Sequence, residues 1–451
     1  MKIVIVGAGT VGSAICSQLV HEGHDVTLVD IHSDVLTAIT NKYDIFGVVG
    51  NGADISVLRK ANIEKADLLI AVSSNDEINI LCGLAAKKLG VRHTIARVRN
   101  PEYSGLIQYL KNDLSISLTI NPEFAVAKEI YRSLRFPSAT KINTFCHGRV
   151  EMAEFTVSED SPLCNSKLFE LRSKLNIRFL VCAVLRNDEA FIPTGSFVIK
   201  AGDTICVTAS EDDITKLFKT IGIYKQPVRD VLIVGGGHTT YYLETLLQKA
   251  KIRSTIIERN KTICRELAED FDCTVICADG TNQELLLEEG LAKTDAFIAL
   301  SDVDEENAII SMYAKSQGKG KIITMISSFA YLELFKGLGL DSIVSPKFST
   351  ASYITKFVRG MSNVRGSEIE SLHTLLEGKV EALEFRIKES IYDLTGIPLK
   401  DLQLQDGVLI ACIVRKDKII IPSGDDFIER DDTVITVTTE TQIKGIKEIL
   451  R

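Results

Sequence analysis

A glycine-rich turn near the start of the chain carries the residue types that bind a dinucleotide. The turn consists of Gly7, Ala8, Gly9, Thr10, Val11 and Gly12, and it follows a short apolar run at residues 3–6. A second apolar run, residues 26–29, ends at Asp30, which is 30 − 12 = 18 positions after the third glycine. Strand, glycine turn, helix, strand and acid are the order of a dinucleotide-binding βαβ unit.

Each of these residue types has a physical reason. Gly7 permits the tight turn, Gly9 lets the backbone approach a pyrophosphate, and Gly12 lets the helix pack closely on the strand. The amino end of the helix then offers free N–H groups and a positive dipole to phosphates. Asp30 can accept hydrogen bonds from a ribose and would repel a 2′-phosphate, so NAD(H) or a simple adenine nucleotide is favoured over NADP. The alternative is a glycine turn in an α/β domain that binds no ligand.

The composition describes a globular protein of several domains. The chain has 451 residues, of which 45% are hydrophobic and 25% charged, and its formal net charge is −8. This acidic balance argues against nucleic-acid binding. No run approaches the roughly 20 apolar residues that span a bilayer, so we expect a cytosolic protein. The 10 cysteines form no C-x-x-C pair, and we assign no transition-metal site and no disulfide.

Strands and helices alternate after Asp30, which predicts a doubly wound parallel sheet, a Rossmann-like α/β fold. Ligands of such sheets bind at the carboxyl ends of the strands. The expected strand ends there carry Asn51 and Gly52, then Ser73 and Ser74, then Arg97. A helix is predicted over residues 122–135, and from Val150 a small strand-rich α/β unit runs to about Gly222.

The chain then repeats itself at an offset of 228 residues. The second glycine turn is Gly235, Gly236, Gly237, His238 and Thr239, and Glu258 stands where Asp30 does. The small strand-rich unit also recurs. We therefore expect two Rossmann-like domains, each followed by a small α/β domain, with boundaries at residues 1–137, 140–222, 229–360 and 368–451.

The two halves differ at positions that matter for a ligand. Thr240 replaces Gly12 and Met325 replaces Arg97. The Cβ of Thr240 is expected to push its helix away from the strand, at a cost of about 1–3 kcal/mol if the backbone cannot relax. The second site is thus predicted to be weakened or altered, with a purely structural role as the open alternative.

The glycine turn with Asp30, the G-N-G-A-D segment at residues 50–54 and the S-S-N-D-E-x-N loop at residues 73–79 resemble regulator-of-potassium-conductance domains, also called RCK or KTN domains. The duplicated order of large and small domains is similar to the TrkA family, the peripheral NAD-binding subunits of Trk potassium uptake systems. This resemblance implies a homo-oligomeric, tetrameric ring on the cytoplasmic face of a TrkH- or TrkG-like membrane potassium channel or transporter. It also implies binding of NAD(H), or alternatively of ATP or ADP, which gates that partner.

Carried over by motif, the resemblance implies that Gly7–Val11 binds phosphate, Asp30 the ribose, and Asn51 and Gly52 the adenine side. It adds contacts from Ser73, Ser74 and Arg97, and in the second half from residues 235–239 and Glu258. Glu123 follows Asn121 and Pro122, where some relatives bind a divalent ion; a first-turn helix glutamate is the alternative.

Two other functions remain open from the residues. An NAD-dependent oxidoreductase would need a proton donor or acceptor beside the nicotinamide, and no such constellation stands out, so we assign no catalytic residue. A nucleotide-sensing regulator of a different ion transporter is the second alternative.

Overall fold

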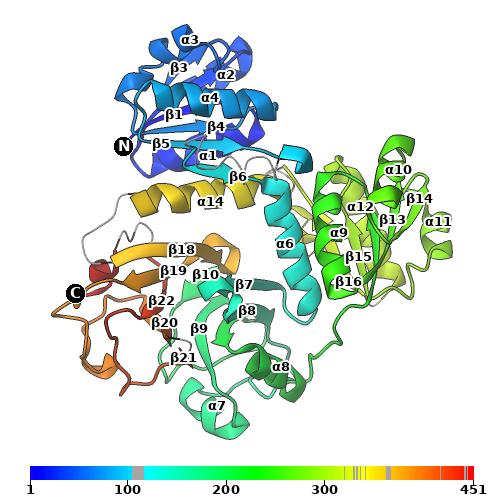
Figure 1. Cartoon of the computed structure of the whole chain (residues 1–451). Helices are drawn as coiled ribbons and strands as arrows, with labels where there is room; N and C mark the ends of the chain where they lie inside the picture. Colours follow the sequence, from blue (N-terminus) through cyan, green and yellow to red (C-terminus); the bar gives the residue numbers. More distant parts are fainter. Residues whose placement is uncertain are drawn as a thin grey trace. The chain divides into compact units, whose positions relative to one another are not determined.

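The computed structural model of the chain describes residues 1–103, 116–318, 320–328, 331, 334–335, 337–340, 342–361, 367–416, 418–440, 443 and 445–451. These residues form two compact units. One contains Met1–Tyr131 and Val228–Thr355, and the other contains Arg132–Pro227 and Lys356–Arg451. Each unit is built from two sheets, shown in Figure 1. The predicted junction between residues 360 and 368 falls largely outside the described residues.

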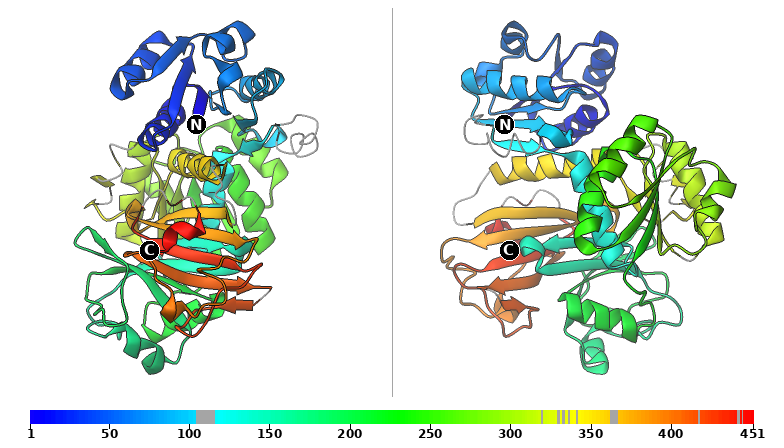
Figure 2. Two further views of the ribbon diagram at one scale, coloured as in Figure 1. Left: turned by 90° about the vertical axis from the view of Figure 1, so that its left-hand side faces the viewer. Right: turned by 45° about the vertical axis from the view of Figure 1, so that its right-hand side comes forward.

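The first sheet is fully parallel, with strand order β3-β2-β1-β4-β5-β6. Its central strands are almost completely buried, because helices cover both faces (Figure 2). This confirms the predicted doubly wound fold. The strands are β1 (Lys2–Val6), β2 (Asp25–Asp30), β3 (Phe46–Val49), β4 (Leu68–Ala71), β5 (His93–Arg97) and β6 (Leu118–Ile120).

Two helices of this domain, α3 and α4, begin at side chains that cap them. The Asp54 side chain accepts a hydrogen bond from the Ser56 N–H at the start of α3, and Asn75 accepts one from Ile78 at the start of α4. The apolar sides of α3 and α4 bury Leu58 and Cys82 against one face of the sheet. The helices are α1 (Thr10–His21), α2 (Ser33–Tyr43), α3 (Ile55–Lys60), α4 (Asp76–Lys88) and α6 (Pro122–Arg135), with a 3-10 turn, η1 (Ile63–Lys65).

The second parallel sheet repeats the first. Its order, β14-β13-β12-β15-β16-β17, is that of the first sheet strand for strand, which confirms the duplication. Its strands are β12 (Asp230–Val234), β13 (Arg253–Glu258), β14 (Thr274–Cys277), β15 (Ala296–Ala299), β16 (Lys321–Met325) and β17 (Ile343–Val344). Its helices are α9 (His238–Ala250), α10 (Lys261–Asp270), α11 (Gln283–Glu288), α12 (Asp304–Gln317) and α14 (Pro346–Met361).

The two small domains each contain a five-stranded antiparallel sheet, with orders β10-β9-β11-β8-β7 and β18-β19-β22-β20-β21. The first has β7 (Lys141–Phe145), β8 (Val150–Thr156), β9 (Phe179–Arg186), β10 (Glu189–Phe191), β11 (Thr204–Ala209), α7 (Leu168–Leu175), α8 (Glu211–Thr220) and η2 (Cys146–Gly148). The second has β18 (Ser367–Leu375), β19 (Val380–Ile387), β20 (Val408–Arg415), β21 (Lys418–Ile420), β22 (Thr433–Thr438) and the 3-10 turns η3 (Leu376–Gly378), η4 (Leu399–Asp401) and η5 (Ile446–Ile449).

The first strand of each small domain, β7 or β18, was not predicted from the sequence. The prediction began the strand-rich region at Val150, and this start was wrong. The tight turn after β7 places Cys146 at φ 51°, and the turn after β18 places Leu376 at φ 46° and Glu377 at φ 63°. Such residues seldom adopt positive φ, so they give no turn signal in the sequence.

The two small sheets share one hydrophobic core. Phe145, Met152 and Cys182 from the first sheet pack with residues of the second that include Leu375 and Val437. Polar contacts join the same faces: the Lys141 ammonium donates to the Thr374 carbonyl at 3.0 Å. One face of each small sheet is therefore buried by the other small sheet of the chain rather than by helices of its own domain.

The turns before the last long strand of each small domain hold a buried aspartate. Asp203 is 1% exposed and accepts hydrogen bonds at 2.7 Å from two nitrogens of Arg186. Asp432, also 1% exposed, accepts bonds from Arg415 in the same way. In both small domains the aspartate directly before this strand is thus a buried charge paired with an arginine.

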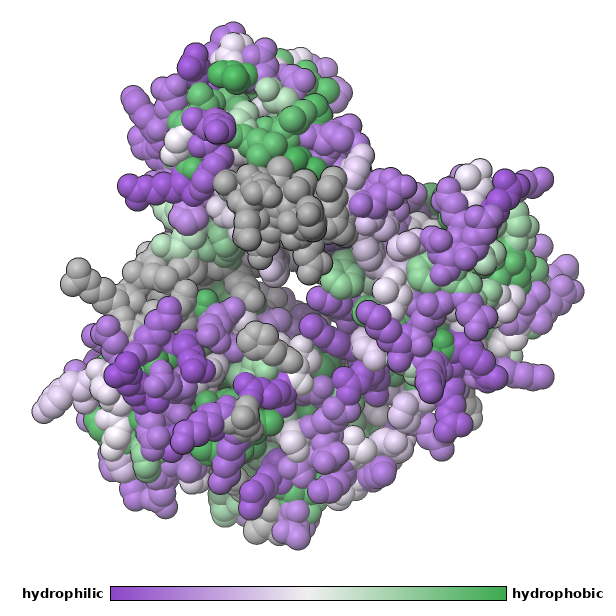
Figure 3. All heavy atoms as spheres, in the orientation of Figure 1, coloured by the Kyte–Doolittle hydropathy of each residue, from purple (hydrophilic) through white to green (hydrophobic). Residues whose placement is uncertain are grey.

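Hydrophilic side chains dominate the face of the molecule drawn in Figure 3, as the composition predicts. No helix among the described residues is both long enough and apolar enough to cross a bilayer.

Glu244 on α9 makes the stability of the second parallel domain depend on pH. Its side chain is 1% exposed; Oε2 accepts a hydrogen bond from the Ser254 hydroxyl at 2.8 Å, and Oε1 has no partner among the described residues. Burial raises the pKa of Glu244 to about 7 from its ordinary 4.5, although the Ser254 bond opposes the shift. Between these two values the folded state binds more protons than the unfolded state, so stability falls as pH rises.

The Glu244→Gln variant is expected to lose this dependence. Between about pH 5 and about pH 8, the wild-type chain should lose about 2 kcal/mol more stability than Glu244→Gln. Urea unfolding followed by circular dichroism at both pH values measures the difference. Parallel pH profiles for the two chains would contradict the prediction.

Candidate functional site

The three glycines of the first turn do three different things. Gly7 has φ +104°, and a Cβ there would lie 2.7 Å from the Ser73 nitrogen. A Cβ at Gly12 would lie 1.8 Å from the Gly7 carbonyl oxygen, so this glycine lets α1 pack against β1. A Cβ at Gly9 would meet no atom within 4 Å. Gly9 is therefore not required by packing, and the space above it is open to a ligand.

The amino end of α1 is open as well. Gly9 is the N-cap residue, and no side chain caps the helix. Thr10 is exposed, whereas Ala8 and Val11 are 1% and 6% exposed, so only the backbone of these two residues can reach a ligand. Uncapped N–H groups at a helix start form an anion-binding position.

Asp30 lies at the end of β2 and supports the glycine turn directly. Its Oδ2 accepts a hydrogen bond from the Ala8 N–H at 2.5 Å, and its Oδ1 accepts one from the His32 N–H at 2.8 Å. Burial alone would raise the pKa of Asp30, but these bonds, together with the His32 ring, hold it below the ordinary value. The carboxylate is therefore ionised at neutral pH and stands beside the turn.

Asn51 and Gly52 follow β3. The Asn51 side chain is exposed and its Oδ1 accepts a hydrogen bond from the Ala53 N–H at 2.9 Å. Gly52 is buried, and a Cβ there would lie 2.3 Å from a methyl group of Val6. The structure thus gives Gly52 a packing role next to β1, while Asn51 faces outward at the carboxyl edge.

Ser73 and Ser74 follow β4, and Ser73 is held by a residue outside the predicted site. Asn79 is 0% exposed; its Oδ1 accepts bonds from the Ser73 N–H and hydroxyl, both at 2.8 Å, and its Nδ2 donates to the Ser73 and Arg97 carbonyls. Asn307 makes the equivalent bonds to Ser301 and Met325. The repetition of this asparagine at the 228-residue offset was the signal that could have identified it.

Arg97 ends β5, as predicted, but its guanidinium is paired within the protein. Nη2 lies 3.5 Å from Oε1 of Glu123 at the start of α6, and the two side chains are 13% and 14% exposed. Burial lowers the pKa of Arg97, and the Glu123 carboxylate opposes that shift. Among the described residues, no group of three His, Cys, Asp or Glu could hold a metal ion, near Glu123 or elsewhere.

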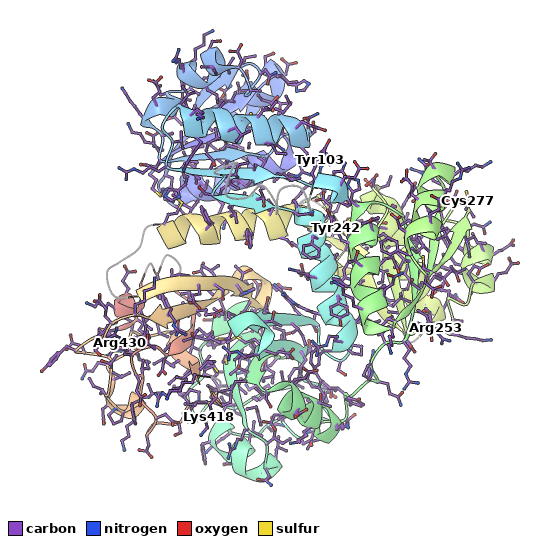
Figure 4. All side chains as sticks on the ribbon, in the orientation of Figure 1. Tyr103, Tyr242, Arg253, Cys277, Lys418 and Arg430 are labelled. Atoms are coloured by element: carbon purple, nitrogen blue, oxygen red, sulfur yellow. The ribbon has the colours of Figure 1, made fainter. Side chains whose placement is uncertain are left out.

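Arg99, two residues further on, links the loop after β4 to the second parallel domain. Its Nη2 donates to the Ser74 carbonyl at 2.5 Å. Its own carbonyl accepts a hydrogen bond from the Tyr242 hydroxyl of α9 at 2.9 Å, and the Tyr242 ring lies 5.3 Å from that of Phe124 (Figure 4). The sequence did not identify this contact.

The second glycine turn lines a cavity of about 230 Å³ at the carboxyl edge of its sheet. Gly235, Gly236 and Gly237 form one wall, and Glu258 forms another. The Glu258 carboxylate accepts bonds from the Gly236 N–H at 2.6 Å and the Asn260 N–H at 2.7 Å, which repeats the arrangement of Asp30. His238 is exposed where α9 begins, and Thr239 is 5% exposed and packs inward.

Thr240 contacts the turn that it was predicted to crowd. Its side chain is fully buried, and its Oγ1 donates to the Gly235 carbonyl at 2.6 Å. The expected displacement of α9 from the strand stays a prediction. Gly235 keeps φ +100°, close to the +104° of Gly7, so the turn retains its conformation.

Comparisons with known proteins agree with this arrangement. The TrkA-N domain matches residues 3–122 and 231–346, and the TrkA-C domain matches residues 152–222 and 383–451. The chain is 33% identical to a Trk system potassium uptake protein TrkA homolog from Archaeoglobus fulgidus over 100% of both chains. It is 32% identical to Trk system potassium uptake protein TrkA from Vibrio alginolyticus, over 96% of this chain and 95% of that one.

Among solved structures, the fold resembles the GsuK channel bound to NAD. The TM-score is 0.64 at 16% identity, and the match covers 99% of this chain and 78% of that one. The likeness extends through both pairs of large and small domains.

Proposed function

Because this chain belongs to the TrkA family, we propose that it is a regulatory subunit of potassium uptake that responds to a bound nucleotide. The observation that carries this proposal is the space above Gly9, which lies between an uncapped helix start and the Asp30 carboxylate. A pyrophosphate on the helix and a ribose on the acid fit that arrangement. NAD(H) is the proposed ligand, with ATP or ADP as the alternative.

The remaining parts of the proposal follow from the family. The chain assembles as a homo-oligomeric ring, with four subunits as the proposed number. It acts at the inner face of the cell membrane through a TrkH- or TrkG-like potassium channel or transporter. We assign it no catalytic reaction. The domain boundaries at 1–137, 140–222, 229–360 and 368–451 and the predicted site residues are kept as part of the proposal.

Ligand binding can act on the rest of the subunit through Arg99. Its side chain donates to the Ser74 carbonyl beside the first glycine turn, and its own carbonyl accepts a hydrogen bond from Tyr242 of the second parallel domain. A ligand shifts a conformational equilibrium only by its difference in affinity for the two states, typically about 1–3 kcal/mol for each coupled site. Several equivalent sites in a ring would add these contributions.

The Asp30→Ala variant tests the proposed site. It should weaken binding of NADH or ADP to the full chain at least about tenfold, because a ribose contact and a support of the glycine turn are both lost. Isothermal titration measures the affinity, and potassium flux in vesicles that contain the membrane partner measures the response. Asp25→Ala, an exposed acid at the other end of the same strand, is the matched control. Equal affinities for the two variants would reject the site.

A further inference from the structure

Two thiols contact each other beside the second glycine turn. Cys264 lies near the start of α10 and is 8% exposed, whereas Cys277 ends the edge strand β14 and is exposed to solvent (Figure 4). A hydrogen bond joins the two side chains. All ten cysteines of the chain are free thiols in the structure. The pair therefore combines a thiol that solvent reaches with a second, buried thiol held against it.

The same two thiols lie against the end of β13, which borders the cavity. The Cys264 thiol donates to the Glu258 carbonyl at 3.2 Å, and Cys277 Sγ lies 4.0 Å from the Arg259 carbonyl oxygen. Glu258 and Cys277 are also paired residues of the parallel strands β13 and β14. Glu258, Arg259 and Ile263 all line the cavity. The thiol pair thus lies directly behind residues that border the proposed ligand.

The fold does not require thiols at these two positions. The residues 228 positions earlier are Leu36, which is 4% exposed, and Val49, which is 55% exposed. They occupy the same places in the first parallel domain, one in α2 and the other at the end of β3. Apolar side chains therefore suit both positions, so packing does not explain why the second domain carries two sulfurs there.

Cys264 is the reaction partner that the structure gives Cys277. In the described part of the chain, no group of three His, Cys, Asp or Glu could hold a metal ion, so the pair is not part of a metal site there. Cys273 stands at the other end of β14, 277 − 273 = 4 residues from Cys277. Four residues of extended strand span about 13 Å, whereas a disulfide needs Cα atoms within about 7 Å.

The two thiols differ in reactivity, and this difference sets the order of their reaction with a disulfide oxidant. Burial raises the pKa of Cys264 to about 11, and the hydrogen bond with Cys277 adds to the shift. Because the thiolate is the nucleophile, Cys264 is poorly reactive at neutral pH, and the exposed Cys277 meets the oxidant first. Cys277 gives its proton to solvent, its sulfur attacks one sulfur of the oxidant, and the S–S bond of the oxidant breaks. The thiolate that leaves takes up a proton.

The second step closes a bond within the protein. Cys264 gives its proton to solvent and attacks the Cys277 sulfur of the mixed disulfide, and the second thiolate leaves and is protonated. In sum, two protein thiols are oxidised and one low-molecular-weight disulfide is reduced to two thiols, with no net release of protons. Contact between the two thiols favours this step, because the attack is intramolecular.

We infer that Cys264 and Cys277 form a redox modification site, at which a low-molecular-weight disulfide creates a reversible disulfide bond between α10 and β14 that weakens nucleotide binding at the second glycine turn. This bond removes both S–H groups from the end of β13. It also shortens the sulfur–sulfur contact to about 2.05 Å, which draws β14 and α10, the helix that carries Ile263, together. The effect on nucleotide binding rests on the proposed function, whereas formation of the disulfide does not.

Incubation of the full chain with glutathione disulfide tests whether the bond forms. In peptide mass mapping, Cys264 and Cys277 should appear in one linked peptide pair in most of the protein, and dithiothreitol should separate the two peptides. If the linked pair does not form, or if Cys277 is linked to Cys273 instead, the inference is overturned.

Variants that carry the residues of the first domain separate the two steps. Cys264→Leu lacks the second thiol, so glutathione should stay attached to Cys277 as a stable mixed disulfide. Cys277→Val lacks the exposed thiol, so Cys264 should remain unmodified. Circular dichroism checks that both variants are folded. If Cys277 gains no glutathione in Cys264→Leu, it is not the reactive thiol, and the inference is wrong.

Titration of ADP into the full chain with Gly9→Ala measures the second glycine turn, because the added methyl group fills the open space of the first. Oxidation should weaken ADP binding to this variant at least about fivefold. Adding Cys264→Leu and Cys277→Val to Gly9→Ala should abolish the effect of glutathione disulfide. An effect that persists without the two cysteines would contradict the assignment.

The remaining outcomes separate this inference from the proposed function. If the wild-type chain binds ADP, but the reduced Gly9→Ala chain binds none or binds it equally well after oxidation, the coupling to the second turn is rejected and the proposed function stands. If the disulfide forms but neither the wild-type chain nor Gly9→Ala binds ADP or NADH, the proposed function is rejected and the modification site stands.

Discussion

The Gly9→Ala variant is expected to keep the stability of the wild-type chain while its affinity for NADH or ADP falls at least about tenfold. The backbone at Gly9, with φ −62° and ψ −171°, is accessible to any residue. An alanine Cβ would meet no protein atom within 4 Å. The added methyl group would instead occupy the space in which the proposed pyrophosphate would contact the turn. The change in unfolding free energy should stay within about 1 kcal/mol.

Gly7→Ala is the contrasting control for this experiment. Its Cβ would lie 2.7 Å from the Ser73 nitrogen, and its φ of +104° is costly for any residue with a side chain. We expect a stability loss of about 2–4 kcal/mol, so its binding defect would come from a distorted fold. Circular dichroism during urea unfolding and titration with NADH separate the two variants. If Gly9→Ala binds NADH with wild-type affinity, the first turn is not the nucleotide site.

The parallel domains could be predicted from the sequence because their signals are local. The buried strands β1 and β4 are short apolar runs between glycine turns and helices, and only a sheet covered on both faces buries such runs completely. The 228-residue repeat then predicts the second parallel domain from the first. Periodicity, turn residues and duplication all act over short distances along the chain, so they leave a mark in the sequence.

The features that the sequence did not predict depend on contacts between distant residues. The face of the small sheet that carries Met152 is as apolar as any buried face. Its sequence pattern does not indicate whether a helix or the sheet of the other small domain covers it. Asn79 is an ordinary polar residue until the fold brings Ser73 and the Arg97 carbonyl to its amide. The hydrogen bond from the Thr240 hydroxyl to the Gly235 carbonyl was not predicted either.

The ion pair of Arg97 and Glu123 is another contact that the sequence did not predict, because 123 − 97 = 26 residues separate the two residues. From the sequence each residue was interpreted alone, Arg97 as a phosphate contact and Glu123 as a divalent-ion ligand or a helix first-turn acid. In the structure they form one largely buried ion pair, between the end of β5 and the start of α6. Nε of Arg97 and Oε2 of Glu123 have no hydrogen-bond partner among the described residues.

Replacing Arg97 with methionine, the residue found at position 325 of the second domain, should lower the unfolding free energy by about 3 kcal/mol. The loss comes from Glu123, whose carboxylate would remain 14% exposed at the start of α6 without its cation. Methionine fills much of the volume of arginine, so a cavity contributes little to the effect. Urea unfolding of the full chain, followed by circular dichroism, measures the change.

The double variant Arg97→Met with Glu123→Gln identifies the cause. Removing both charges should recover most of the lost stability, because the energetic cost of the single change is an unpaired buried charge and not the absence of the pair itself. If the double variant is as unstable as Arg97→Met, packing around the guanidinium rather than its charge holds α6 at the edge of the sheet. If Arg97→Met alone costs less than about 1 kcal/mol, water reaches the pair and screens it, and the contact does little to fix the start of α6.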